Sequence, residues 1–480
     1  MVLIVRAPET YLAERRYVLD VVLGEWLGLA YDLHVDQVSQ VEIRVAGDPE
    51  AKVLTAPDVL FATPSADWLT ERSIPIPPLE HVEPSWRPLA GSPVLPAGGL
   101  EPWDRNPIPA LFSNSNTAGI AGRASASGIH LNLDIFGSVF FVISGYEERT
   151  RRTRDEHDRF PAGASLAAMG GFLERPIVDE YVDLLWDAIR SLWPTAVRRR
   201  SSFRLRLTHD VDRPWASLGQ RTWVVAHGLA GDLVRRRDPG LALNRALSFL
   251  DARRGRVSRD PFNTFDMLMD TSEHHGLQST FYFMAGDGSN GIDGQYRVSD
   301  PEIARLLKRV HDRGHEIGLH SSYESYRSPE RIRGEFESLR AACRVAGFDQ
   351  PTWGVRQHYL RFDNPQTWRG QDAAGFDHDS TLGFAEHIGF RMGTCREYPV
   401  FDLLARRALK LRERPLLVMD ATFWYMDVGP EEAALRTRAV VDRCRYHGGD
   451  AVLLVHNSSL LGARRRAQYA ALVAAIAGDG

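Results

Sequence analysis

Two aspartates, Asp210 and Asp212, stand two positions apart in the 480-residue sequence, directly after an alternating apolar run at 203–207. This run predicts a β-strand, and residues two apart in an extended segment point to the same side. Two carboxylates on one side repel each other unless a cation or an arginine lies between them. Exposed turn aspartates are the commoner use of such a pair. Because other predicted strands end in similar groups, we favour a divalent metal ion here.

The other predicted strands also end in side chains that ionise or bind metal. They are His320, Arg356, His358, Tyr359, Asp379 and His456. In parallel βα barrels the functional side chains gather at the carboxyl ends of the strands, so we expect these residues to form one site. His311 and His315 have the spacing of a helical zinc pair, but Gly314 predicts a helix end between them. We therefore interpret both as structural.

Several alternative motifs are absent or incomplete. The loop at 286–294 is rich in Gly and Asp, but a calcium-binding loop would need glycine in place of Ile292 and glutamate in place of Val298. We interpret it as a flexible rim loop. No P-loop, GxGxxG after a strand, or GxSxG is present, which argues against nucleotide-binding and serine-hydrolase functions.

The elements that must position these residues alternate between strand-like and helix-like segments after residue 200, a pattern that predicts an α/β fold around a parallel sheet. Four helix starts, at 260–261, 300–301, 328–329 and 364–365, place a capping side chain before a proline. We predict a distorted, closed (β/α)7 barrel. Its expected strands are 203–209, 279–285, 315–320, 352–358, 378–383, 415–423 and 451–457.

The first 200 residues have a different sequence pattern, with short apolar runs and a long connection at 73–108 that is rich in Pro and Gly. They predict a smaller α+β domain (1–200) before the barrel domain (201–480). A helical pattern at 177–192 ends before Pro194, and the arginines at 198–200 are expected to form a solvated linker. The apolar run at 133–141 predicts an ordered, buried segment.

Composition limits the partners and the compartment. Lys and Arg total 58 against 62 Asp and Glu, a formal charge of −4, so no overall basic field attracts nucleic acid. No apolar run approaches the ~18 residues of a membrane span. The cysteines, Cys343, Cys395 and Cys444, form no CxxC pair and no even set, which favours a reducing compartment. We expect a cytoplasmic protein; the sequence does not indicate its oligomeric state.

Residues from about 200 to 480 resemble the polysaccharide deacetylases, metal-dependent carbohydrate esterases that share the chitooligosaccharide deacetylase homology domain. Five stretches carry the resemblance in the family's order: 208–212, 320–324, 356–359, 379–380 and 454–457. The longer strings 208–212, 354–362 and 379–384 resemble a bacterial subgroup with an extra N-terminal domain. The resemblance implies removal of N-acetyl groups from an N-acetylated saccharide.

The resemblance also implies a role for each matching residue. Asp212 and His320 would bind one divalent ion, with zinc as the expected metal. The family's second histidine is replaced by Glu324, which is either the third ligand or a helix-start carboxylate, and His358 is the other candidate. A carboxylate there would shift the preference away from zinc-like ions.

The remaining roles concern proton transfer and charge stabilisation. Asp210 would be the general base and His456 the general acid, while Arg356 would brace the base and Asp379 would orient the acid. The backbone N–H of Tyr359 would help to stabilise the oxyanion. Two alternatives remain open: a catalytically inactive barrel that binds glycan or a partner enzyme, and hydrolysis of another C–N bond such as a cyclic amide.

Overall fold

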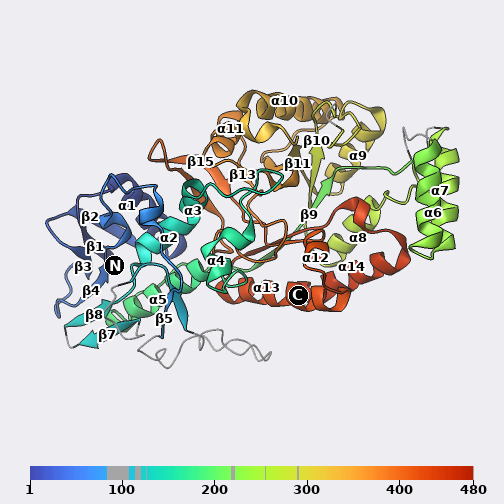
Figure 1. Cartoon of the computed structure of the whole chain (residues 1–480). Coiled ribbons are helices and arrows are strands. Elements are labelled where there is room, and N and C mark those ends of the chain that lie inside the picture. Colours follow the sequence, from blue (N-terminus) through green and yellow to red (C-terminus); the bar gives the residue numbers. More distant parts are fainter. Residues whose placement is uncertain are drawn as a thin grey trace.

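The structure is a computed structural model that describes residues 1–83, 107–113, 121–125, 127–217, 222–254, 256–288 and 291–478. Most of the connection expected at 73–108 therefore lies outside the described residues. Two sheets with their helices lie at the left and centre of Figure 1, and a pair of helices projects at the right. Among the described residues, no helix combines the length and the apolar character that crossing a membrane requires.

The N-terminal half contains a six-stranded mixed sheet, as the α+β expectation requires. Its strands, in spatial order, are β2 (Ala30–Val35), β1 (Val2–Ala7), β3 (Gln40–Val45), β4 (Val53–Pro57), β8 (Gly128–Leu131) and β7 (Gly122–Ser125). A separate two-stranded sheet pairs β5 (Glu80–Val82) with β6 (Ile108–Ala110). The helices of this half are α1 (Leu12–Leu19), α2 (Ile135–Ile143), α3 (Tyr146–Thr150), α4 (Leu166–Met169) and α5 (Ile177–Leu192). The segment expected to be buried, 133–141, includes most of α2. All nine residues of this segment are buried.

The C-terminal half contains a curled sheet of nine strands, parallel except for one hairpin. In spatial order they are β14 (Tyr398–Asp402), β15 (Arg407–Glu413), β13 (His378–Asp379), β12 (Gly354–Gln357), β11 (Glu316–Ser321), β10 (Thr280–Met284), β9 (Arg204–Val211), β17 (Asp450–Leu454) and β16 (Val418–Met419). Each of the seven expected strands has a counterpart, which confirms the α/β fold class. The expected closure is wrong: among the described residues the sheet ends at β14 and β16, a half-barrel. The β14–β15 hairpin, which sequence analysis missed, extends the sheet beyond β13.

Helices follow most of these strands. They are α6 (Thr222–Val234), α7 (Pro239–Ala252), α8 (Phe265–His274), α9 (Pro301–Asp312), α10 (Pro329–Val345), α11 (Gln366–Ala374), α12 (Thr422–Tyr425), α13 (Pro430–His447) and α14 (Gly462–Ala477). Two of the four expected starts are confirmed, at α9 and α10, although only Ser328 of α10, and not Asp300 of α9, caps its helix through the side chain. The start expected at 260–261 is wrong, because α8 begins at Phe265 and Asp260 accepts the N–H groups of Ala216 and Ser217. At 364–365 the helix is present but begins one residue later than expected, and Asn364 donates to backbone carbonyls of the N-terminal half.

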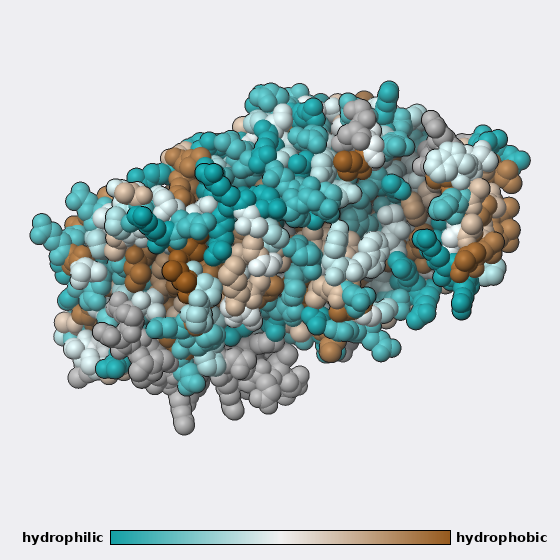
Figure 2. Space-filling model, viewed as in Figure 1, coloured by the Kyte–Doolittle hydropathy of each residue, from teal (hydrophilic) through white to brown (hydrophobic). Residues whose placement is uncertain are grey.

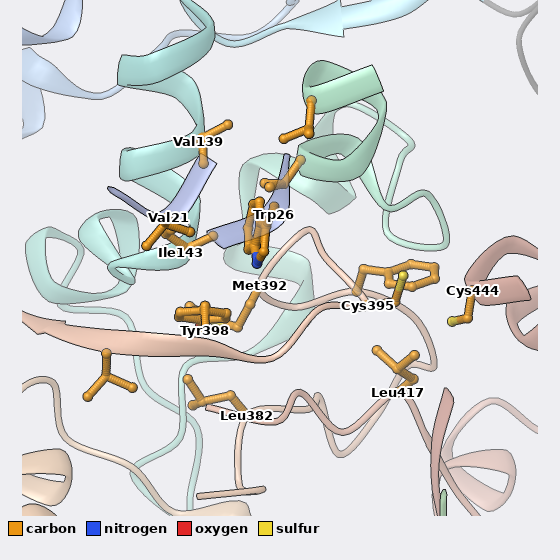
Figure 3. Close-up of a cluster of buried hydrophobic side chains, with 14 of the residues drawn as sticks. Val21, Trp26, Val139, Ile143, Leu382, Met392, Cys395, Tyr398, Leu417 and Cys444 are labelled. Carbon is orange, nitrogen blue, oxygen red and sulfur yellow. The ribbon is translucent and has the colours of Figure 1, made fainter. Parts of the chain in front are cut away.

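The two halves share one hydrophobic core. Val21, Trp26, Val139 and Ile143 of the N-terminal half belong to the same buried cluster as Leu382, Met392, Tyr398 and Leu417, and Figure 3 shows these side chains close together. Two ion pairs join the halves beside this cluster, Asp179 with Arg396 at 2.8 Å and Glu148 with Arg391 at 2.6 Å. Burial of this apolar surface fixes the N-terminal half against the sheet that carries the candidate site.

Candidate metal centre and its acid–base partners

Most of the expected site residues come from neighbouring strand ends of the curled sheet. Asp210 lies near the end of β9 and Asp212 directly follows it. His320 lies in β11 opposite Arg356 of β12, in register. His456 follows β17, the neighbour of β9 on its other side. The strand order therefore brings together residues that lie up to 246 positions apart in the sequence.

Three of these residues form a group with the geometry of a metal site. One ligand atom from each of Asp212, His320 and His358 lies within 4.8 Å of the others. Asp212 Oδ1 is 3.2 Å from His320 Nε2 and 3.9 Å from His358 Nε2. Both imidazoles therefore present Nε2 to one carboxylate oxygen.

The other ring nitrogen of each histidine is held by a hydrogen bond. His320 Nδ1 lies 3.0 Å from the carbonyl oxygen of Arg356, and His358 Nδ1 lies 2.6 Å from Asp293 Oδ1. Because a carbonyl oxygen only accepts, the Nδ1 of His320 carries the proton and donates it. A neutral His320 then has a free Nε2 lone pair, which is the arrangement found in metal-binding histidines.

The donor set fits a divalent ion. Asp212 Oδ1 is buried and has no hydrogen-bond partner among the described residues. Burial alone would raise the pKa of the Asp212 carboxyl, but the three surrounding imidazoles lower it below its ordinary value. Burial would likewise lower the pKa of His320, whereas Asp210 and Asp212 raise it overall. An ionised carboxylate and two imidazoles around one buried point are a usual protein ligand set for catalytic zinc.

Glu324 does not belong to this group. It precedes a short 3-10 turn, Ser325–Arg327, its side chain is 54% exposed, and its Oε1 atom lies 3.6 Å from Arg361 Nη1. The chain leaves β11 at Ser321 and turns to the surface, so a residue four positions after His320 faces solvent. Of the two candidates for the third ligand, the geometry favours His358. Of the two roles expected for Glu324, the ligand role is corrected and the helix-start carboxylate is the one that agrees with its position before Ser325 and its contact with Arg361.

Asp210 is buried beside the metal group and is fixed by Arg356. Arg356 Nη1 donates to Asp210 Oδ1 at 2.8 Å and to Thr208 Oγ1 at 3.0 Å, and the guanidinium lies over the Tyr282 ring. Ser380 holds its other two nitrogens through its carbonyl and hydroxyl oxygens. The second carboxylate oxygen of Asp210 faces His320 Nε2 at 3.6 Å. One oxygen is therefore neutralised by Arg356 and the other is directed toward the metal group.

His456 lies on the other side of Asp212 and is held by a residue that sequence analysis missed. Its Nδ1 is 2.6 Å from Asp420 Oδ1, its backbone N–H donates to Asp420 Oδ2, and its Nε2 is 3.7 Å from Asp212 Oδ2. Burial lowers the pKa of His456, but the carboxylates of Asp420, Asp212 and Asp210 outweigh it, Asp420 most of all, and raise the pKa to about 10. The Nε2 atom of His456 is directed toward the same centre.

Asp379, which was expected to orient His456, does not contact it in the described part of the chain. Its Oδ1 accepts from Gln371 and Thr381, and it shares a hydrogen bond with Glu413. Asp379 pairs with strands β12 and β15, whereas Asp420 directly follows β16, the neighbour of β17. Burial raises the pKa of both Asp379 and Glu413, to about 6 for Asp379, and the Asp379 carboxylate raises the pKa of Glu413 further. Asp379 therefore interacts with its neighbour within the sheet, Glu413, rather than with His456.

Tyr359 adopts left-handed backbone angles, with φ at 60°. Its ring is partly exposed and contacts His157 of the N-terminal half at a centroid distance of 4.6 Å. The carbonyl oxygen of Tyr359 accepts from Arg159, and His157 Nδ1 lies 3.0 Å from Tyr323 Oη. A segment from the N-terminal half therefore forms part of the rim. The role of the Tyr359 N–H stays a prediction.

Two further expectations concern residues near the site. His315 Nδ1 accepts the Ser279 N–H and His311 stacks on Phe348, in keeping with structural roles for both. The loop at 286–294, of which positions 289 and 290 lie outside the described residues, is anchored by Asp293. Asp293 Oδ1 accepts the Tyr323 N–H at 2.9 Å as well as contacting His358. The loop therefore supports the candidate metal centre, which the expectation of a flexible rim had missed.

Comparisons with known proteins add the following. Residues 3–194 match the model of a family of unknown function (DUF7033). No curated protein matches the chain. Similar solved structures include a Mycobacterium smegmatis protein assigned to the polysaccharide deacetylases, at 17% identity and a TM-score of 0.36, covering 58% of this chain and 85% of that one.

Two other solved structures are also similar. A Pseudomonas aeruginosa PAO1 protein with the same assignment is 14% identical at a TM-score of 0.35, covering 64% of this chain and 90% of that one. A CE4 family pseudoenzyme from Bacillus anthracis is 10% identical at a TM-score of 0.28, covering 57% of this chain and 59% of that one. At these identities and TM-scores the similarity does not assign an activity.

Proposed function

We propose that this protein is a metal-dependent hydrolase that removes N-acetyl groups from the amino sugars of an oligo- or polysaccharide. The observation that supports it is the grouping of Asp212, His320 and His358 between a carboxylate braced by arginine and an imidazole held by Asp420. Amide hydrolysis needs a base to activate water and an acid to protonate the departing amine. A module that only binds glycan needs no base, acid and metal ligands together.

Each residue has a distinct task in this proposal. A divalent ion, which we propose to be zinc, would be held by Asp212, His320 and His358 and would polarise the amide carbonyl and acidify water. Asp210 accepts the proton of the attacking water, and Arg356 fixes its orientation. His456 donates the proton of Nε2 to the amine that leaves, and the backbone N–H of Tyr359 donates to the developing oxyanion.

The N-terminal half contributes to the same site in this proposal, because His157 and Arg159 contact Tyr323 and Tyr359 at its rim. We propose the cytoplasm, or another reducing compartment, as the location; the three cysteines are buried and free, which supports it. The extra N-terminal half also supports a place within the bacterial subgroup suggested by the longer sequence strings.

A combined measurement tests the proposal. Purified full-length protein is analysed for bound metal and assayed for acetate release from N-acetylated glucosamine oligomers, beside an Asp212→Ala variant. We expect about one divalent ion per chain and acetate release, both lost in the variant. Metal without acetate release from any N-acetylated saccharide would favour hydrolysis of another C–N bond. Neither metal nor turnover would favour a barrel that only binds glycan or a partner enzyme.

A further inference from the structure

Helices α6 and α7 form a hairpin that projects from the body of the protein. They pack on each other, and no other helix or strand among the described residues makes comparable contact with either. In Figure 1 the pair lies at the end of the molecule opposite the N-terminal sheet. The hairpin follows β9, and only the segment 213–221 separates it from Asp212.

Few side chains of this hairpin are buried: three are apolar, Val225, Leu241 and Ala242, and two are polar, Asp232 and Ser248. Its buried centre is ionic: Asp232 is fully buried and accepts from Arg236 at 2.7 Å and from Arg245 at 2.6 Å. Nearby, the buried Ser248 bonds Ser217. A buried ion pair contributes little net stability, and three buried apolar side chains are few for two helices of 13 and 14 residues.

Several large apolar side chains of the hairpin face solvent instead. They are Trp223 (66% exposed), Leu233 (53%), Val234 (74%), Leu243 (61%) and Leu250 (53%). Trp223 and Val234 are eleven residues apart and Leu243 and Leu250 are seven apart, so each pair lies on one face of its helix. Figure 2 shows hydrophobic surface gathered at this end of the molecule. Exposed apolar side chains concentrated in this way mark an interaction surface.

The charge around this apolar surface is strongly positive. Residues 222–260 contain eight arginines and four aspartates, whereas the whole chain has a net charge of −4. Two of those aspartates are buried, Asp232 and Asp260. Arg235 and Arg237 lie at the turn between the helices and Arg254 and Arg256 after α7; all four are exposed and form no ion pair with a described residue.

We propose that the α6–α7 hairpin docks the protein on an anionic lipid surface, lying in the plane of the interface without crossing the bilayer. A helix with Trp and Leu exposed beside arginines has the composition of interfacial membrane helices. The arginines at both ends of the hairpin would reach lipid phosphates, and Trp223 would lie at the headgroup level. A second copy of the chain fits less well, because a two-fold contact brings the same arginine-rich rims together.

Docking at this place has a structural consequence for the candidate site. Asp210 lies in β9 and Asp212 directly follows it, with nine residues between Asp212 and the start of the hairpin, so the strand end would be held near the lipid surface. The inference does not depend on the proposed hydrolase function, since binding to lipid is measured without turnover.

Co-sedimentation with vesicles tests the inference. Full-length protein is mixed with vesicles of equal parts phosphatidylglycerol and phosphatidylcholine, or with phosphatidylcholine alone. A Trp223→Ser, Val234→Ser, Leu250→Ser variant removes the apolar contacts, and an Arg235→Glu, Arg237→Glu variant reverses the charge. We expect binding to anionic vesicles only, about tenfold weaker in each variant and weakened by salt.

Two control variants change α10, which is far from the hairpin in the sequence. Val345→Ser replaces another apolar side chain, which is 85% exposed, and the Arg333→Glu, Arg344→Glu variant reverses two exposed charges. These should bind as the wild type does, and circular dichroism melting should show that all variants are folded. No binding by the wild type, or equal binding by the hairpin variants, overturns the inference. The inference is also overturned if the wild type forms a dimer in lipid-free analytical ultracentrifugation and the apolar variant loses this dimer but binds lipid as the wild type does.

Discussion

The imidazole of His456 and the carboxylate of Asp420 lie 2.6 Å apart at the ends of adjacent strands, β17 and β16. The carboxylate also accepts the backbone N–H of His456, so it fixes both the ring and the chain. This pairing makes Asp420, rather than Asp379, the residue that positions the proposed acid. It also explains why the pKa of His456 is raised to about 10 despite burial.

The first prediction separates these two aspartates. Asp420→Asn removes the charge that raises the pKa of His456, so the alkaline limb of the turnover profile should move to lower pH and kcat should fall by about ten- to a hundredfold. Metal content should stay at the wild-type level. Asp379→Asn is the matched control and should leave the alkaline limb in place. An unchanged limb in Asp420→Asn, or a shifted one in Asp379→Asn, contradicts the assignment.

A second prediction concerns the third metal ligand. His358→Ala should lower the affinity for zinc by at least about a hundredfold, because it removes one of three protein ligands. Glu324→Gln should leave the affinity unchanged, since that carboxylate faces solvent beside Arg361. Competition with a fluorescent chelator measures both. The reverse order of effects would assign the ligand to Glu324.

Asp293 allows a related test that does not touch a metal ligand. Its carboxylate holds the Nδ1 atom of His358, so Asp293→Asn should weaken zinc binding by about ten- to a hundredfold while the ligands remain. Asp287→Asn, in the same loop, is the control and should bind zinc as the wild type does. Equal affinities in all three proteins would show that Asp293 serves only to anchor Tyr323.

The sequence predicted the parts of this site that depend on local pattern. Apolar runs located seven strands, and the polar residues at their ends included Asp210, Asp212 and His320, because parallel strands bring their carboxyl ends to one edge. Asp420 was not identified, although it lies inside the expected strand at 415–423, where the observed β16 ends at Met419. Its pairing with His456 depends on which strands are adjacent, and local pattern does not encode that order.

Asp293 and Glu324 also show that local pattern does not encode which residues meet: sequence analysis missed the first and offered the second as a metal ligand. Asp293 lies in a loop rich in glycine and without periodicity, so nothing in the sequence indicated that it is buried against His358. Glu324 has the spacing of a ligand, but the chain turns after β11 and exposes it. The β14–β15 hairpin was missed although 407–413 has apolar residues at alternate positions, since that segment lies between two expected parallel strands.

The rim formed by the N-terminal half leads to a prediction about substrate binding, which rests on the proposed function. His157→Ala removes the contacts with Tyr323 and Tyr359, so KM should rise about three- to tenfold, as expected for the loss of one positioning hydrogen bond. Turnover and zinc content should change little. His34→Ala, at an exposed position of β2, is the control. A KM equal in all three proteins would exclude the rim from substrate binding.

The last prediction concerns the contact between the halves through Asp183 of α5 and His447 of α13, whose Oδ2 and Nδ1 atoms are 2.8 Å apart. Burial raises the pKa of Asp183, but His447 and nearby arginines lower it overall; burial lowers the pKa of His447, but Asp183 raises it overall. The Asp183 contribution to stability is present above its ordinary pKa and lost as the pH falls. The His447 contribution is present below its ordinary pKa and lost as the pH rises through the higher folded value.

The pair should therefore stabilise the protein most between about pH 4 and pH 6.5, the ordinary values of the two groups. His447→Gln should lower the free energy of unfolding by about 1–3 kcal/mol at pH 6, because Asp183 Oδ2 loses its charged partner while Oδ1 keeps Arg198. The loss should be smaller at pH 9, where the wild-type imidazole is increasingly neutral. Urea unfolding at both pH values measures it, with the exposed His274→Gln as control. A loss of equal size at both pH values would mean that the contact acts through packing rather than through charge.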